Sequence, residues 1–96
     1  MAASATSVQR RDDVLAFAGA LSREAVPALW PPALRALDGA RRFDLSQVDS
    51  VDSAGLALLA ELAQRAGGVA VDGNPPGLDG LRKAYRLSPS LDFAQA

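Results

Sequence analysis

Short apolar runs separated by turn residues indicate a chain in which strands and helices alternate. Residues 14–19 are almost wholly apolar and lie between Asp12-Asp13 and Ser22, as is typical of a short buried strand. Residues 42–45 alternate between polar and apolar side chains, and residues 69–71 form a shorter apolar run. We therefore predict strands over residues 6–10, 14–19, 42–45 and 69–71, with residues 46–51 forming a connection.

The clearest helical pattern covers residues 54–66, where apolar side chains return every three or four positions. Asp52 or Ser53 is expected to cap its first turn, and Gly67 and Gly68 are expected to end it.

An earlier helix is expected to begin after an N-cap at Ser22 and to end near Trp30. A proline disfavours helical backbone in the residue before it, so Pro31 and Pro32 should interrupt this helix. A separate helical piece with proline as its first residue should then cover residues 32–37.

A last helix is predicted over residues 78–87, followed by a short tail that contains Leu91 and Phe93. The resulting order, β-β-α-β-α-β-α, predicts a mixed sheet with helices packed on it. The first six residues are small and polar and are expected to be flexible.

Composition narrows the possible functions. Ninety-six residues, 49% of them hydrophobic and 22% charged, suit one small globular domain. A net charge of −1 argues against a positive potential over the whole domain, of the kind that would attract nucleic acid. The chain has no Cys and no His, so it cannot build a Ser-His-Asp triad, a thiolate nucleophile or the common zinc sites. We expect no enzyme activity, no metal and no cofactor; a metal-dependent enzyme built on Asp44, Asp49 and Asp52 would have only a weak oxygen site.

The sequence shows neither a signal peptide nor a membrane-spanning segment. The first residues lack the apolar region of a signal peptide, and the longest apolar stretch, residues 56–60, is far too short to span a membrane. We expect a cytoplasmic protein without a transmembrane segment.

A helical wheel of residues 54–66 separates two faces. The predicted core stripe contains Leu56, Leu59, Leu62, Ala63 and Ala66, and the opposite face contains Ser53, Ala57, Glu61, Gln64 and Arg65, with Ala54 and Leu58 on its flank. The small residues would let another backbone approach closely, with Leu58 as an apolar anchor in a polar rim. The alternative is that Asp52 and Ser53 only cap the helix and that one exposed leucine has no function. Trp30 could likewise cover the core or anchor an interface.

The residues around this helix resemble the STAS domain family. Asp44-Leu45-Ser46 followed by Val51-Asp52-Ser53-Ala54-Gly55-Leu56 is similar to the family's strand end "D-L-S" and its helix start "V-D-[ST]-x-G-L". Val26-Pro27-Ala28-Leu29-Trp30 and Leu81-Arg82-Lys83-Ala84-Tyr85-Arg86-Leu87 are similar to the first and last helices of one branch, the MlaB-type accessory subunits of bacterial phospholipid-transport ABC systems. The resemblance covers residues 7–93, which we take as the domain.

The resemblance implies an α/β fold with a four- to five-stranded mixed sheet and helices packed on one side. It also implies a non-catalytic accessory subunit that binds an MlaF-type ATPase in the cytoplasm, and is associated through it with a permease, lipid-binding subunits and the inner membrane. Other branches of the family are anti-sigma-factor antagonists, which are switched by phosphorylation at the position of Ser53. The expected partner-binding residues are Trp30, Asp52, Ser53, Ala54, Gly55, Ala57, Leu58, Glu61 and Arg65, with Ser53 as a possible phosphorylation site.

Overall fold

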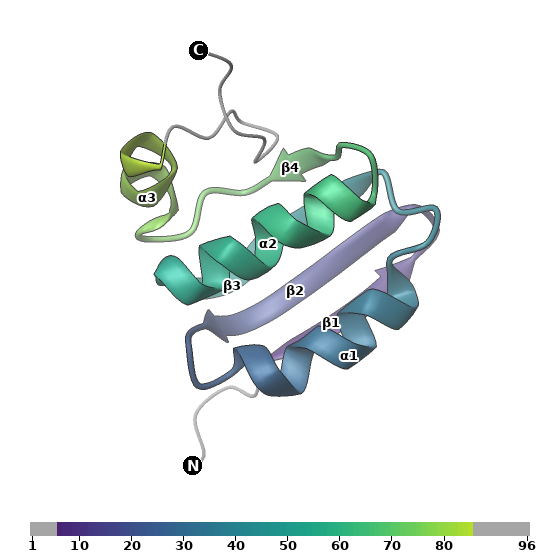
Figure 1. Ribbon diagram of the computed structural model, residues 1–96, viewed down its shortest axis with the longest axis horizontal. Helices are drawn as coiled ribbons and strands as arrows, with labels where there is room; N and C mark the ends of the chain where they lie inside the picture. The colour runs from purple at the N-terminus through teal and green to yellow at the C-terminus, as the bar shows by residue number, and fades with distance from the viewer. Residues whose placement is uncertain (1–5, 86–96) are drawn as a thin grey trace.

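The computed structural model describes residues 6–85, which form a four-stranded mixed sheet with three helices (Figure 1). In chain order the elements are β1 (Ser7–Arg11), β2 (Val14–Leu21), α1 (Val26–Ala36), β3 (Arg42–Val51), α2 (Ser53–Arg65), β4 (Ala70–Asp72) and α3 (Leu78–Ala84). The predicted α/β class and the predicted order of elements are confirmed. The predicted tail with Leu91 and Phe93, and the domain boundary at residue 93, lie outside the described residues, as do residues 1–5 of the N-terminal segment.

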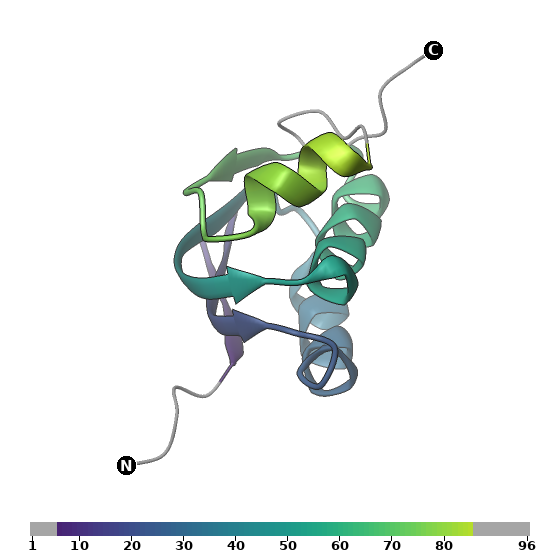
Figure 2. The ribbon, with the colours of Figure 1, turned by 90° about the vertical axis from the view of Figure 1, so that its left-hand side faces the viewer.

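The strands follow one another across the sheet in the order β1-β2-β3-β4. β1 and β2 form an antiparallel hairpin, while β3 runs parallel to both β2 and β4. The two parallel connections contain α1 and α2, and these helices lie side by side on one face of the sheet (Figures 1 and 2). α3 packs against α2. The carboxyl ends of β2 and β3 therefore bring the starts of α1 and α2 to the same end of the domain.

The core lies between the sheet and the two central helices. Phe17 of β2 and Phe43 of β3 meet edge to face, with ring centroids 5.6 Å apart and an interplanar angle of 68°. Leucines fill most of the remaining space, as expected from a composition that is poor in aromatic residues.

The third strand is longer than predicted. Residues 46–51 were expected to form a connection, but β3 continues to Val51 and pairs with β2 up to the match of Val51 with Leu21. Val48 and Val51 are buried, with exposed fractions of 6% and 5%. Two register shifts relative to β2 break the strict alternation of buried and exposed residues, so a period of two could not reveal this part of the strand.

The first helix differs from its prediction in two ways. α1 continues through Pro31 and Pro32 to Ala36, so the predicted interruption and the separate piece over residues 32–37 are wrong. Buried Leu29 and Ala33 lie on either side of the prolines, and their packing on the sheet holds the helix together despite the lost hydrogen bonds. The residue at the N-cap is Ala25 rather than Ser22.

Smaller differences affect the ends of the other elements. The last strand is β4 at Ala70–Asp72, one residue later than predicted. α3 covers Leu78–Ala84 with Tyr85 as its C-cap, and the predicted helical residues 86 and 87 lie outside the described residues. None of the helices in residues 6–85 combines the length and the apolar character that crossing a bilayer requires.

Candidate partner-binding site

The start of α2 is organised by Asp52, its N-cap residue. One carboxylate oxygen, Oδ1, accepts a hydrogen bond from the amide of Gly55 at 2.9 Å, as expected of an N-cap. The other oxygen, Oδ2, accepts a hydrogen bond at 2.9 Å from the amide of Arg23, in the loop that follows β2. Asp52 therefore ties the loop before α1 to the first turn of α2. The predicted cap at Asp52 or Ser53 is confirmed for Asp52, while Ser53 is the first helical residue.

These hydrogen bonds hold the pKa of Asp52 below its usual value, with the amide of Gly55 as the largest cause and that of Arg23 next. The pKa of Asp44 is also lowered, through hydrogen bonds from the hydroxyl and the amide of Ser46. A carboxyl whose pKa is lower in the folded than in the unfolded protein contributes stability that is present above the unfolded pKa and is lost as pH falls through the folded pKa.

We therefore expect the free energy of unfolding to fall when the pH is lowered below about 4, the unperturbed pKa of aspartate. Asp52→Asn should reduce the slope of this loss and leave the part that belongs to Asp44. Urea unfolding at a series of pH values measures both slopes. An unchanged slope in Asp52→Asn would contradict the assignment.

Gly55 has a packing role inside the domain. It is buried, and a Cβ atom at this position would lie 2.0 Å from the carbonyl oxygen of Leu21. Only glycine lets the first turn of α2 approach the end of β2 this closely. The packing of Gly55 on β2 is thus observed, and its contact with a partner stays a prediction.

The exposed face of α2 largely follows the wheel. Ser53, Ala57, Glu61, Gln64 and Arg65 are exposed and Ala54 is half-buried, whereas Leu56, Leu59, Leu62 and Ala63 are buried. Leu58 is the exception, because its exposed fraction is only 3%. The prediction of an exposed anchor at Leu58 is wrong.

The neighbouring helix explains the burial of Leu58. Arg65 lies two turns after Leu58 on the same side of α2, and its guanidinium carbon is 5.4 Å from the ring centre of Trp30 on α1. α1 therefore covers this side of α2, so the buried arc is wider than the stripe that faces the sheet. Trp30 itself is half-buried and packs against the core, and Arg65 also pairs with Glu61 at 3.0 Å. Trp30, Glu61 and Arg65 thus form a cluster at the outer seam between α1 and α2.

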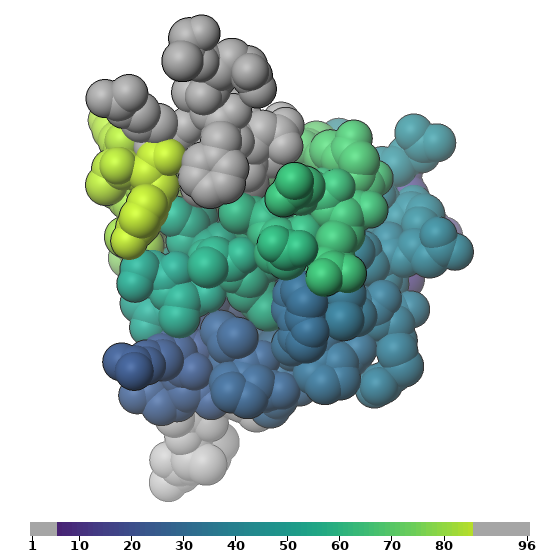
Figure 3. All heavy atoms as spheres, in the orientation of Figure 1, coloured from purple at the N-terminus to yellow at the C-terminus, as the bar shows by residue number. Residues whose placement is uncertain are grey.

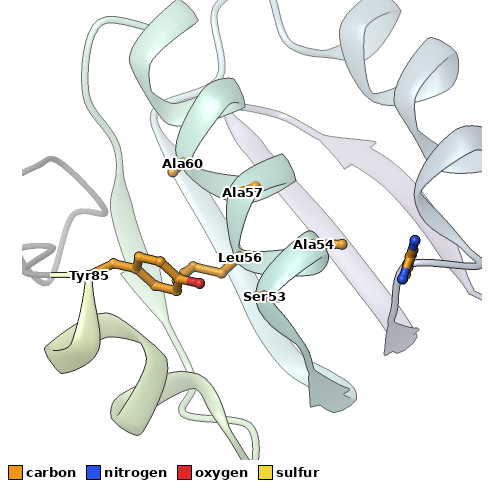
Figure 4. Close-up of a pocket in the computed structure, with 7 residues that line it drawn as sticks. Ser53, Ala54, Leu56, Ala57, Ala60 and Tyr85 are labelled. Carbon is orange, nitrogen blue, oxygen red and sulfur yellow. The ribbon is translucent and has the colours of Figure 1, made fainter.

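A groove of about 440 Å³ extends across the first turns of α2, with Tyr85 on one side of the helix and Ala54 on the other (Figure 4). It is lined by Arg23, Ser53, Ala54, Leu56, Ala57, Ala60 and Tyr85. Tyr85 comes from the end of α3, and its ring points toward Leu56 on α2 (Figure 4). Half of the surface of Tyr85 is exposed. The groove thus combines a floor of small residues, an aromatic wall and one guanidinium.

The groove brings together three of the predicted partner residues, Ser53, Ala54 and Ala57. The predicted set lacked Arg23 and Tyr85, which reach the groove from the loop before α1 and from the end of α3. No local pattern points to them, because their proximity to Ser53 depends on the way that the three helices pack. The space-filling view places α1 and α2 side by side on one face, with α3 at its corner (Figure 3).

The carboxylates do not form a metal centre in the part of the chain that the structure describes, where no group of three His, Cys, Asp or Glu residues has a suitable arrangement. Asp44 and Asp52 lie near opposite ends of β3, about 25 Å apart at the rise of an extended strand. Each of them already accepts backbone hydrogen bonds.

The fold and this helix start define the class of protein. A mixed sheet with its helices on one face, and a central helix that opens with Asp-Ser-Ala-Gly after the third strand, agree with the match of residues 4–89 to the family described as "Mlab, STAS domain". The chain therefore belongs to the STAS family, in its Mlab group.

Two curated relatives are similar over most of their length. The chain is 38% identical over 77 residues to the intermembrane phospholipid transport system binding protein MlaB of Escherichia coli strain K12. The match covers 79% of this chain and 76% of that protein. The protein of the same name from Shigella flexneri matches with the same identity and the same coverage.

Proposed function

We propose that this chain is a non-catalytic accessory subunit of a phospholipid-transporting ABC system, and that it binds and stabilises the ATPase of that system. The observation that carries the proposal is the groove on α2, which begins at Ser53 in the motif that the family shares. The names of the two relatives support it, because both are binding proteins of an intermembrane phospholipid transport system.

The residue content supports a binding role rather than catalysis. The sequence has no His or Cys, and general acid–base chemistry near pH 7 would need a carboxyl or lysine with a strongly shifted pKa. In the described residues, the two carboxyls with shifted pKa values are Asp44 and Asp52, and both shifts are downward. A lowered pKa keeps a carboxylate ionised and makes it a weaker base.

The proposed contact surface has two parts. The first is the groove floor, with Ser53, Ala54 and Ala57; the second is the seam cluster of Trp30, Glu61 and Arg65. Small side chains along the exposed face of a helix let a partner's backbone approach closely, and Trp and Arg are enriched among residues that dominate binding energy. Asp52 supports the surface by holding the loop before α1 in place. The proposed location is the cytoplasmic side of the inner membrane, reached through the transporter.

Ser53 is proposed as a contact residue. The alternative function, an anti-sigma-factor antagonist, would require phosphorylation of Ser53, which is exposed at the start of a 13-residue helix. A phosphate would add a charge of about −1.5 to −2 beside the carboxylate of Asp52. Mass spectrometry of the protein from its native cells separates the two functions: an unmodified Ser53 in the ATPase-bound protein agrees with the contact role, and binding that depends on phosphate at Ser53 assigns the regulatory function.

The central test is co-purification of the chain with the ATPase subunit of its own transporter. Wild-type protein is expected to bind, and Ala57→Arg is expected to lose binding at least about a hundredfold, because a long charged side chain would stand on the floor of the groove. The variant should keep its fold, since Ala57 is exposed.

Ala70→Arg provides the matched control. It makes the same change at an exposed alanine of β4, whose partner in the register is Arg42. This variant should bind like the wild type. Normal binding by a folded Ala57→Arg would place the partner surface elsewhere, and failure of the wild-type chain to bind the ATPase would contradict the proposed function.

A further inference from the structure

The polar groups of the groove on α2 share one chemical character. Among the lining residues that the structure describes, Arg23 carries a charge, and Ser53 and Tyr85 contribute hydroxyl groups. A guanidinium offers only N–H donors, and both hydroxyl groups can donate as well.

Two nearby acidic residues, Asp52 and Glu61, do not cancel the hydrogen-bond donor character of the groove. Asp52 lies close enough for its charge to act on Arg23. Its two carboxylate oxygens, however, already accept hydrogen bonds from the backbone amides of Gly55 and Arg23. Glu61, on the exposed face of the same helix, pairs with Arg65 at 3.0 Å, on the side of α2 that faces Trp30. Within residues 6–85, the groove is therefore lined by donors and apolar groups and by no carboxylate.

The floor has the geometry of a helix-packing surface. Ala54, Ala57 and Ala60 are spaced three residues apart, so they lie along one i±3 row of the helix surface. Because all three are alanines, the row is low, and a ridge of side chains from a second helix can lie in it. Tyr85 walls one side with an aromatic ring that is half exposed.

From these observations we infer that the element that docks in the groove is a helix of the partner with an apolar face and an Asp or Glu carboxylate placed against the guanidinium of Arg23. This inference rests on the proposed function and names the chemistry of the partner at the same site. Arg23 is then a specificity-determining residue. Its backbone position is set by Asp52, and its side chain selects a helix that carries a carboxylate at the right end.

The test measures the affinity of the full chain for the purified ATPase subunit of its own transporter, by biolayer interferometry at low and at high salt. Arg23→Glu should raise Kd at least about tenfold, since it turns an attractive pair into a repulsive one inside a desolvated groove. Arg23→Gln should weaken binding by less and should remove most of its salt dependence. Both substitutions keep the backbone amide of residue 23, which donates a hydrogen bond to Asp52. Circular dichroism should therefore show an unchanged fold.

Arg35→Glu is the matched control, because it makes the same charge change at an exposed residue near the end of α1. It should bind within about twofold of the wild type if the effect of Arg23 is local rather than a result of net charge.

The outcomes separate the two proposals. If Arg23→Glu binds as tightly as the wild type while Ala57→Arg does not bind, the ATPase docks in the groove without a carboxylate and this inference is wrong, although the proposed function stands. If the wild-type chain does not bind the ATPase, both are wrong. If sedimentation shows a homodimer that Ala57→Arg separates, the occupant is a second copy of the chain, and the inference is again wrong.

Discussion

Leu58→Asp is expected to unfold the domain, which would appear as the loss of the cooperative urea transition that the wild type shows. Leu58 is 3% exposed, and α1 covers the side of α2 on which it lies. Truncating a buried leucine to alanine already costs about 2–5 kcal/mol. An unpaired carboxylate at the same place adds the cost of desolvation, and the whole stability of a domain is only about 5–15 kcal/mol.

Ala57→Asp is the matched control for this change. Ala57 precedes Leu58 in the same helix but is exposed, so its carboxylate would stay in water. This variant should lose no more than about 0.7 kcal/mol, the difference in helix propensity between alanine and aspartate. A folded Leu58→Asp protein with wild-type stability would show that α1 does not cover this side of α2 in solution.

Gly55→Ala is expected to have the second-largest effect, a loss of about 3 kcal/mol or more in the free energy of unfolding. The added methyl group would lie 2.0 Å from the carbonyl oxygen of Leu21 and 2.8 Å from its carbonyl carbon. Both atoms belong to the backbone of a central strand, so the clash cannot be relieved by rotating a side chain. α2 would have to move away from β2, and the Asp52 bridge to the loop before α1 would lengthen.

Gly80→Ala makes the same substitution where there is room. Gly80 lies in α3, and nothing in the described structure comes within 4 Å of a Cβ atom there. Alanine should stabilise this helix by about 0.5–1 kcal/mol. Urea unfolding of both variants against the wild type tests the pair, and equal effects at the two positions would contradict the close contact between Gly55 and β2.

Patterns within single elements were enough for much of the fold. The order of strands and helices, the core stripe of α2 and the cap at Asp52 all follow from residues that are close together in the chain. Hydrophobic periodicity, capping and turn preference are local effects, so they can be recognised in the sequence without knowledge of the tertiary packing. The sequence motifs D-L-S and V-D-S-A-G-L also indicated the family, which could not have been inferred from residue types alone.

Packing between distant elements decided the rest. α1 runs through Pro31 and Pro32 because Leu29 and Ala33 are held on the sheet, and β3 reaches Val51 because β2 pairs along its length. Local preference argued against both, but each is outweighed by burial that only the assembled sheet provides.

The partner surface shows the same division most clearly. Sequence periodicity placed Ser53, Ala54 and Ala57 on the outer face of α2, and the structure agrees. A wheel treats a helix as buried on one side, however, whereas α2 has the sheet beneath it and α1 beside it, which buries Leu58. The contributions of Arg23 and Tyr85 to the groove could be seen only in the tertiary structure. Arg23 precedes Ser53 by 30 residues, and Tyr85 follows Ser53 by more than 30 residues. The three residues come together only because the three helices pack on one sheet.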